Sequence, residues 1–236
     1  MEEKLSGIVL GGVSYGESDK ILNIFTLEKG IVSAKIKGVK KAGAKLKFAS
    51  EPFCFAEFIF STTGSRRTVT GASLIESFYP LREDVIKYFA GGTVLEFLRK
   101  FTKENIVSTE LFMLTIKTLK ELCYLDKEPL YILCSFLLNA LSYSGYALNL
   151  SACALCGCDI KGKTFFDYNS GGFYCEECFD GHGREINPDT FISLCKINKG
   201  EDLEEKPVKP LRLLDFYITY KGEENIVSLK ELIKIM

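Results

Sequence analysis

The chain has 236 residues, of which 47% are hydrophobic and 26% are charged. This composition excludes an intrinsically disordered chain and allows a real core, divided among two or three folded units. The formal net charge is −1 at pH 7, so attraction to a polyanion must come from a local cluster of cations and not from the whole-molecule field.

Short runs rich in Val, Ile and Phe dominate the first 80 residues. Turn-forming sequences such as Gly16-Glu-Ser-Asp19 and Glu28-Lys-Gly30 separate them. Five short strands of this kind predict a small β-barrel, and a five-stranded OB-fold is the nearest match, a fold that commonly binds single-stranded nucleic acid. The expected strands cover residues 6–13, 20–27, 31–36, 52–60 and 67–75.

Several aromatic side chains in this region could stack on bases, although we expect most of them to belong to the core. The apolar positions switch from odd to even numbers between Phe55 and Phe58, which predicts a β-bulge. The candidates are Tyr15, Phe25, Phe53, Phe55, Phe58 and Phe60.

Lysines cluster at the end of the third expected strand and in the loop after it, with no acidic residue from position 35 to position 47. Strand alternation places Val32, Ala34 and Ile36 on one face and the first lysines on the other. Ammonium groups arranged in this way can follow a phosphate backbone. The predicted DNA-binding residues are Lys35, Lys37, Lys40, Lys41, Lys45 and Lys47, with Arg66 and Arg67 after an expected turn at residues 62–65.

The alternative to a nucleic-acid site is a solvated lysine face that only aids solubility, because charge runs are commonly solvated. The lack of compensating acids within the run favours nucleic acid.

The apolar period becomes helical after Tyr79-Pro80. We expect a helix over residues 85–101, weakened or kinked at Gly91-Gly92, a second helix capped by Ser108, and a third beginning at Pro129. No charged residue occurs from position 129 to position 158, which raises the alternative of a membrane span. Polar residues interrupt this run and no stop-transfer signal flanks it, so a buried central helix is expected.

Two CxxC pairs separated by 18 residues form the most specific motif in the chain. Each pair places two sulfurs on one tight turn, and a hairpin between them brings the turns together around one tetrahedral Zn²⁺ ion. Residues 163–168 and 173–174 are the expected strands of that hairpin. The predicted metal ligands are Cys153, Cys156, Cys175 and Cys178.

Disulfides and redox chemistry are alternative roles for these thiols. The chain has nine cysteines, an odd number, and no charged-then-apolar leader after Met1, so disulfides are disfavoured, as is a thioredoxin-like redox motif. Cys158 is a possible spare ligand, and His182, the single histidine, belongs to an exposed loop or substitutes for a thiolate. A closed four-cysteine site is structural, and no catalytic residue is predicted. Small buried residues are expected at Cys54, Cys123, Cys134 and Cys195.

The C-terminal part is expected to be helical. Asn187-Pro188 predicts the start of a helix that ends near residue 197, and residues 198–210 form a charged connection. A further helix carries residues 211–220, and Ser228-x-x-Glu231 predicts a capping box for a last one. The fold class is thus α+β and multidomain. The expected domains are an OB-fold at 1–80, a helical domain at 81–150 plus 185–236, and a zinc-ribbon insertion at 151–184.

Four segments together resemble the bacterial recombination mediator family RecO. They are residues 15–26, beginning Tyr15-Gly-Glu-Ser-Asp, the lysine segment 34–41, the cysteine ribbon after Gly145-Tyr-Ala-Leu148, and Leu211-Arg-x-Leu. The resemblance implies a cytoplasmic, nucleoid-associated DNA repair protein that is not an enzyme and has no contact with membranes. It implies binding to single- and double-stranded DNA, strand annealing, and loading of RecA together with RecR, RecF and the acidic C-terminal tail of the single-strand-binding protein.

Two rival functions remain open from the residues alone. A zinc or thiol oxidoreductase would use the second CxxC pair and would need a reactive, accessible thiolate. A zinc-ribbon transcription or RNA-binding factor would share the basic patch but would prefer particular sequences or RNA.

Overall fold

The computed structural model describes residues 2–64, 66–223 and 225–236, so the expected turn residue Ser65 lies outside it. The chain forms two compact units, Met1–Tyr124 and Leu125–Met236. The three-part division expected from the sequence remains a prediction.

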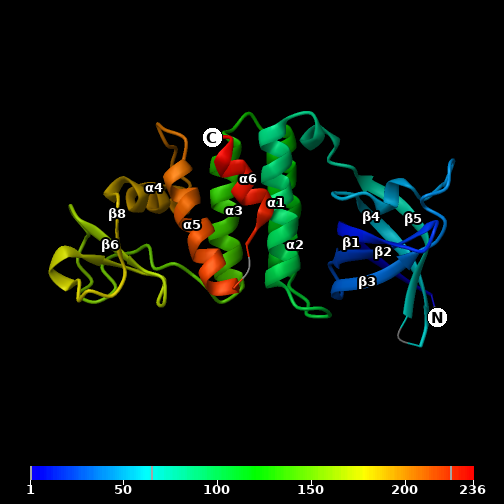
Figure 1. Ribbon diagram of the computed structural model, residues 1–236, viewed down its shortest axis with the longest axis horizontal. Coiled ribbons are helices and arrows are strands. Elements are labelled where there is room, and N and C mark those ends of the chain that lie inside the picture. The colour runs from blue at the N-terminus through cyan, green and yellow to red at the C-terminus, as the bar shows by residue number, and fades with distance from the viewer. Residues whose placement is uncertain (1, 65, 224) are drawn as a thin grey trace. The chain divides into compact units, whose positions relative to one another are not determined.

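Five strands form a closed barrel in the first unit (Figure 1), in the order β1-β2-β3-β5-β4. The pairs are antiparallel, except that β3 and β5 run parallel and meet through only two residue pairs, Lys35 with Thr68 and Ile36 with Val69. This order and closure confirm the predicted OB-fold. The strands are β1 (Glu2–Tyr15), β2 (Asp19–Thr26), β3 (Gly30–Ile36), β4 (Phe55–Thr63) and β5 (Arg66–Glu76).

Alternating side chains fill the barrel. Leu22, Ile24, Val32, Ala34 and Ile36 all point into one core and are at most 2% exposed. The register of β4 against β5 shifts after Phe55 and again after Ile59, which confirms the predicted bulge.

The aromatic residues of the barrel are mostly core residues, as expected. Tyr15 is exposed and Phe55 half-buried. The other four candidates, Phe25, Phe53, Phe58 and Phe60, are buried.

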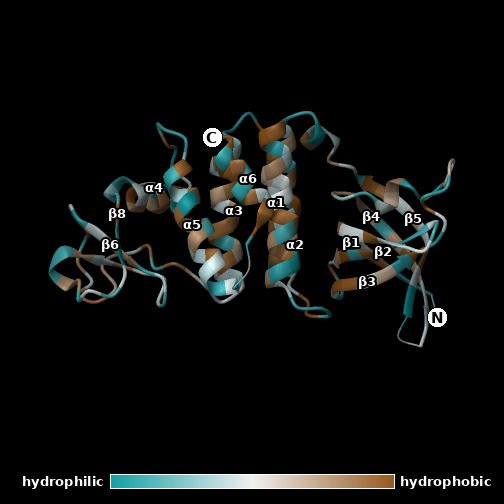
Figure 2. Cartoon of the chain, viewed as in Figure 1, coloured by the Kyte–Doolittle hydropathy of each residue, from teal (hydrophilic) through white to brown (hydrophobic). Residues whose placement is uncertain are grey.

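Two helices complete the first unit: α1 (Val85–Phe101) and α2 (Thr109–Tyr124), with a short 3₁₀ helix, η2 (Tyr79–Arg82), before them. Figure 2 shows hydrophobic and hydrophilic residues interspersed on both. The N-cap predicted at Ser108 is confirmed, since its hydroxyl accepts a hydrogen bond from Leu111 N at 3.4 Å. Helix α2 reaches the barrel through Phe112, whose ring centroid lies 5.5 Å from that of Phe25.

Helix α1 continues unbroken through Gly91 and Gly92. A Cβ atom on Gly91 would lie 3.0 Å from the Phe53 ring and 3.1 Å from Leu81. The glycine therefore lets these two side chains approach the helix backbone closely.

Helix α3 (Pro129–Tyr143) lies in the second unit and has ten buried side chains, which confirms the buried central helix. Across the described residues, every helix falls short of the length and apolar character needed to cross a membrane.

The cysteine region forms a three-stranded sheet in the order β7-β6-β8. Strands β6 (Thr164–Asp167) and β7 (Gly172–Cys175) are the predicted hairpin, and β8 (Arg184–Ile186) was not predicted. Three more helices follow: α4 (Pro188–Lys199), α5 (Val208–Gly222) and α6 (Val227–Lys234).

The two predicted helix starts had different outcomes. Asn187 caps α4, because its side-chain oxygen accepts from Asp189 N at 2.8 Å. The capping box at Ser228 is wrong, because the N-cap position of α6 is Ile226, two residues earlier, and the helix begins at Val227. Ile226 is fully buried, so apolar anchoring positions this helix end.

Gly30→Ala should destabilise the protein more than Gly16→Ala. Both glycines have positive φ, 65° and 63°, which costs an L-residue roughly 1–2 kcal/mol. A Cβ on Gly30 would lie 2.1 Å from Ile106 O, whereas one on Gly16 would have no atom within 4 Å. The two free energies of unfolding, measured in urea, should differ by about 1–3 kcal/mol. Equal losses would show that the contact with Ile106 relaxes without cost.

Candidate metal centre and nucleic-acid interface

The two CxxC pairs come together in the folded ribbon. The Sγ atoms of Cys153, Cys156, Cys175 and Cys178 all lie within 4.8 Å of one another. The first turn is closed by two backbone hydrogen bonds of 2.9 Å, from Cys153 N to Cys158 O and from Gly157 N to Cys153 O. Strand β7 ends at Cys175, and a 3₁₀ turn over Glu176–Cys178 brings in the fourth sulfur.

The spacing of the sulfurs fits a tetrahedral metal. Zinc–thiolate bonds of about 2.3 Å place sulfurs about 3.8 Å apart at the corners of a tetrahedron. The Sγ atoms of Cys156 and Cys175 are 3.8 Å apart. The donor set is therefore sufficient to hold one metal ion.

The first turn also favours a thiolate. Burial acts to raise the pKa of Cys153, but the backbone N–H groups of Cys156, Cys175 and Leu155 donate to its sulfur and lower the pKa to about 6. A deprotonated sulfur is the form that binds a metal.

The remaining cysteines and the histidine lie as follows. Cys158 Sγ is 3.0 Å from Cys156 Sγ but is not a member of the four-sulfur cluster. His182 lies in an exposed loop, as expected. Cys54, Cys123 and Cys134 are buried as predicted, whereas Cys195 is only half-buried. Its thiol is 3.3 Å from Leu150 O.

Aromatic contacts attach the ribbon to the helices of its own unit. The ring of Phe173 lies 4.7 Å from that of Phe191 on α4, and the ring of Phe166 lies 5.5 Å from that of Tyr217 on α5. Phe166 and Phe173 are both fully buried. Small ribbons have little core of their own, so these rings provide much of the ribbon's packing.

The predicted basic surface lies partly on β3 and mostly on the segment that follows it. We call residues 37–47 the lysine loop. Its five lysines are all exposed, and no ion pair is recorded for any of them within the described chain. They are Lys37, Lys40, Lys41, Lys45 and Lys47.

The lysine loop is attached to the barrel at its start. The Gly38 N–H donates to the Asp19 carboxylate at 2.8 Å, and the Lys40 N–H donates to Ser18 O at 3.0 Å. Val39 between them is 2% exposed and joins the barrel core. These contacts hold the backbone and leave the lysine side chains in solvent.

Lys35 differs from the loop lysines. Its Nζ lies 2.9 Å from Asp19 Oδ2 and 4.5 Å from the centre of the Tyr15 ring. Its acidic partner, Asp19, belongs to β2. The sequence of the lysine run contains no acid and therefore could not predict this ion pair. The pairing of Lys20 with Ile36 is the register that places Asp19 beside this lysine.

The two arginines are not brought to the loop. The parallel register of Lys35 with Thr68 places Arg66 toward Ser33, away from Lys37. Arg66 is exposed, whereas the Arg67 guanidinium lies 3.4 Å from Glu3, which also pairs with Lys29.

Comparison with known proteins identifies the family. The model of the recombination protein O N terminus matches residues 1–78, and that of its C terminus matches residues 82–229. The chain belongs to the recombination protein O family. The resemblance seen in the motifs is thereby confirmed, and the C-terminal match includes all four clustered cysteines.

Relatives in this family extend over most of the chain. The DNA repair protein RecO of Acetivibrio thermocellus is 32% identical over 75% of this chain and 70% of its own length. The DNA repair protein RecO of Alkaliphilus metalliredigens is 32% identical over 86% and 82%, respectively. The DNA repair protein RecO of Myxococcus xanthus is 32% identical over 72% of this chain and 70% of its own length.

Cys175→Ser should abolish metal binding, whereas Cys158→Ser should retain it. A serine hydroxyl does not ionise as a thiol does, so replacing one of four clustered ligands opens the site. Metal content per chain and the thiolate absorption of the Co²⁺-loaded protein measure both variants. Loss of metal from Cys158→Ser would identify that residue as a ligand.

Acid should loosen the start of the lysine loop. The Gly38 N–H and then the Lys35 ammonium lower the pKa of Asp19 from 3.8 to about 2. Because the folded-state pKa is depressed, the stabilisation is complete above about pH 4 and is lost as the pH falls through about 2. The Gly38 amide chemical shift should titrate with this low midpoint and should not do so in Asp19→Asn. A midpoint near 3.8 would rule out the anchoring role.

Proposed function

We propose that this protein is a DNA repair and recombination mediator that binds single- and double-stranded DNA without sequence specificity and is not an enzyme. The observation that carries the proposal is the lysine loop, which follows a strand of the OB-fold barrel and whose exposed ammonium groups pair with no acid among the described residues. The relatives named DNA repair protein RecO support the same role.

Binding would occur through the phosphate backbone. Ammonium groups respond to charge and not to base identity, so affinity would depend on salt and little on sequence. Lys37, Lys40 and Lys41 are the leading contacts. Lys35 and Arg67 would contribute less, since DNA would have to displace Asp19 and Glu3 from them.

The metal in this proposal is one structural Zn²⁺ ion. Four thiolates would complete its tetrahedral coordination and leave no position for water or substrate. The ion would stabilise the ribbon, and through Phe166 and Phe173 it would hold the ribbon on α4 and α5. The residues that would hold it are Cys153, Cys156, Cys175 and Cys178.

The wider role follows from family membership. We include in the proposal the annealing of complementary strands and the loading of RecA with RecR and RecF on strands coated by single-strand-binding protein. The acidic tail of that protein would be a further partner. The expected domains 1–80, 81–150 with 185–236, and 151–184 are part of the same proposal, as is a location with the nucleoid in the cytoplasm.

Neutralising the lysine loop should weaken DNA binding. In Lys37→Gln/Lys40→Gln/Lys41→Gln, the loss of three single-strand phosphate contacts should make the slope of log affinity against log salt shallower by about 2. Fluorescence anisotropy with a random-sequence oligonucleotide measures the slope. Lys35 is kept, because its removal would take away the ion-pair partner of Asp19, which anchors the loop.

The matched control is Lys103→Gln/Lys117→Gln/Lys120→Gln, which removes three exposed lysines from the helical part of the same unit. It should retain the original slope. Equal loss in both variants would mean that net charge, and not the loop, determines affinity.

Annealing tests the mediator role separately. Complementary oligonucleotides, bare or coated with single-strand-binding protein, should anneal faster with the protein than without it. Failure on both substrates would exclude the mediator function even if DNA binding were retained.

A further inference from the structure

A small cavity of about 260 Å³ opens where the ribbon meets α4 and α5. Strand β8 contributes Arg184, the chain after β6 contributes Tyr168, and α5 contributes Lys209, Arg212 and Phe216. Its volume is just below the roughly 300–1,000 Å³ of typical small-molecule sites. A cavity of this size has room for one group of a larger ligand, such as a base or a phosphate.

The charges of this cavity have one sign. Its described lining contains three cations and no carboxylate. Arg184, Lys209 and Arg212 are all exposed, and no ion pair is recorded for any of them in the part of the chain that the structure covers. Arg184 and Arg212 line this opening, and Lys209 lies at its border with the larger cavity that Asp189 also lines. Such a group of cations complements an anion such as phosphate.

The same cavity presents aromatic faces. The rings of Tyr168 and Phe216 have centroids 4.5 Å apart and are tilted by 51°. Phe216 is 48% exposed, so part of its ring surface remains open to a stacking partner. Burial raises the pKa of Tyr168, and the neighbouring Arg184 partly offsets this, so the ring remains a neutral phenol beside a cation.

Helix α5 continues this arrangement along its length. Lys209, Arg212, Phe216 and Tyr220 are spaced by three, four and four residues, so they lie along one face of the helix. All four are exposed, and Lys221 Nζ lies 5.9 Å from the centre of the Tyr220 ring. One helix face thus presents cations followed by rings.

We propose that this cavity and the exposed face of α5 form a second binding site for single-stranded nucleic acid, where Phe216 and Tyr168 stack on a base and Arg184 and Arg212 bind flanking phosphates. Stacking on aromatic rings beside a basic groove is the usual way of holding a single strand without reading its sequence. The inference rests on the proposed function, since it adds a site to a protein that binds DNA on its barrel.

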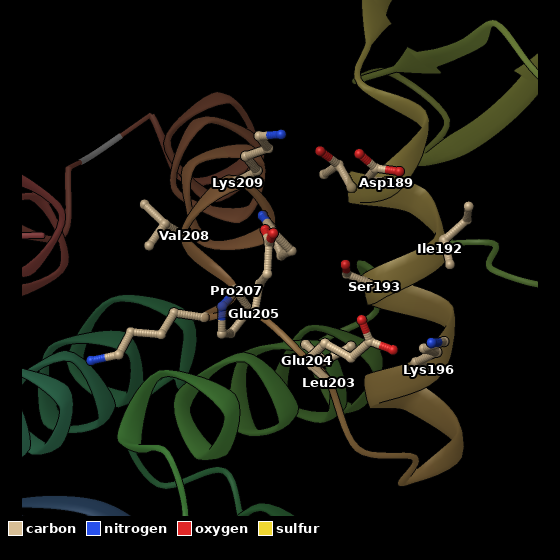
Figure 3. A pocket seen from close by; sticks show the side chains of 13 residues that line it. Asp189, Ile192, Ser193, Lys196, Leu203, Glu204, Glu205, Pro207, Val208 and Lys209 are labelled. Carbon is tan, nitrogen blue, oxygen red and sulfur yellow. The ribbon is translucent and has the colours of Figure 1, made fainter.

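The larger cavity nearby does not share this chemistry. It has a volume of about 550 Å³ and lies between α4 and the segment leading into α5 (Figure 3). Asp189, Glu204 and Glu205 oppose its lysines, and Lys209 in Figure 3 extends toward the helix that carries Asp189. Mixed charge gives this cavity no preference for a polyanion.

An acidic peptide is the alternative occupant of the smaller cavity. It would satisfy the three cations, but it has no regular series of planar faces to match Phe216 and Tyr220 along α5. The alternation of rings and cations therefore favours nucleic acid.

Two variants of the metal-loaded full chain separate the two components of the site, with an oligothymidylate as the probe. Arg184→Gln/Arg212→Gln should make the salt slope shallower by about 1.4, because two phosphate contacts are lost. Phe216→Leu keeps an apolar side chain but removes the ring, so affinity should fall about 5- to 100-fold with the slope unchanged. An oligonucleotide carrying 5-iodouracil should photo-crosslink to Phe216 or Tyr168.

The matched control is Lys161→Gln/Lys199→Gln, which removes two exposed cations from the same unit outside the cavity. It should bind as the unaltered protein does. Thermal melting shows whether each variant is folded. The photo-crosslink is measured on the unaltered protein, so it tests the site even if a variant fails to fold.

The outcomes distinguish this inference from the proposed function. Normal binding by both cavity variants, with binding lost only when the lysine loop is neutralised, would overturn the second site and leave the proposed function standing. If neither the loop nor the cavity variants change DNA binding, both the lysine-loop site and the second site are overturned, and DNA binds elsewhere on the protein. If the cavity variants bind DNA normally but lose binding to a labelled oligoglutamate peptide, the cavity is a peptide site and the inference is wrong.

Discussion

Closure of the barrel is the constraint on which the first unit depends. Strands β3 and β5 meet through only two residue pairs, yet this contact removes the last free edges of the sheet. The chain leaving β3 must then pass outside the barrel before β4 begins at Phe55. Val39 and the Gly38 amide hold the start of that passage against the barrel, so its lysines are exposed by the same geometry that closes the sheet.

The ribbon in the second unit is limited by the shortness of its strands. Its sheet has strands of three or four residues, too short for a core of their own. The clustered sulfurs join its two turns, and the rings of Phe166 and Phe173 join it to α5 and α4. This attachment also brings Arg184 to the cavity beside Arg212 and Phe216.

Local patterns predicted the elements well where periodicity and turn residues agreed. The five strands, the bulge near Phe55, the helix cap at Ser108 and the clustering of the cysteines all followed from short-range spacing. Strand β8 was missed because three residues carry no detectable period. The α6 capping box failed because burial of Ile226 outweighed a side-chain cap.

The sequence by itself determined the barrel, the family and the metal-binding motif, because hydrophobic periods and CxxC spacing act over a few residues. Only the tertiary structure decided which cations are available. Lys35 pairs with Asp19 and Arg67 pairs with Glu3, and in each case the acid lies on another strand. Lys37 has no such ion pair among the described residues. No pattern within a single segment of sequence contains that information. The cavity at α5 likewise depends on three elements brought together by packing, since charge and stacking act through space and not along the chain.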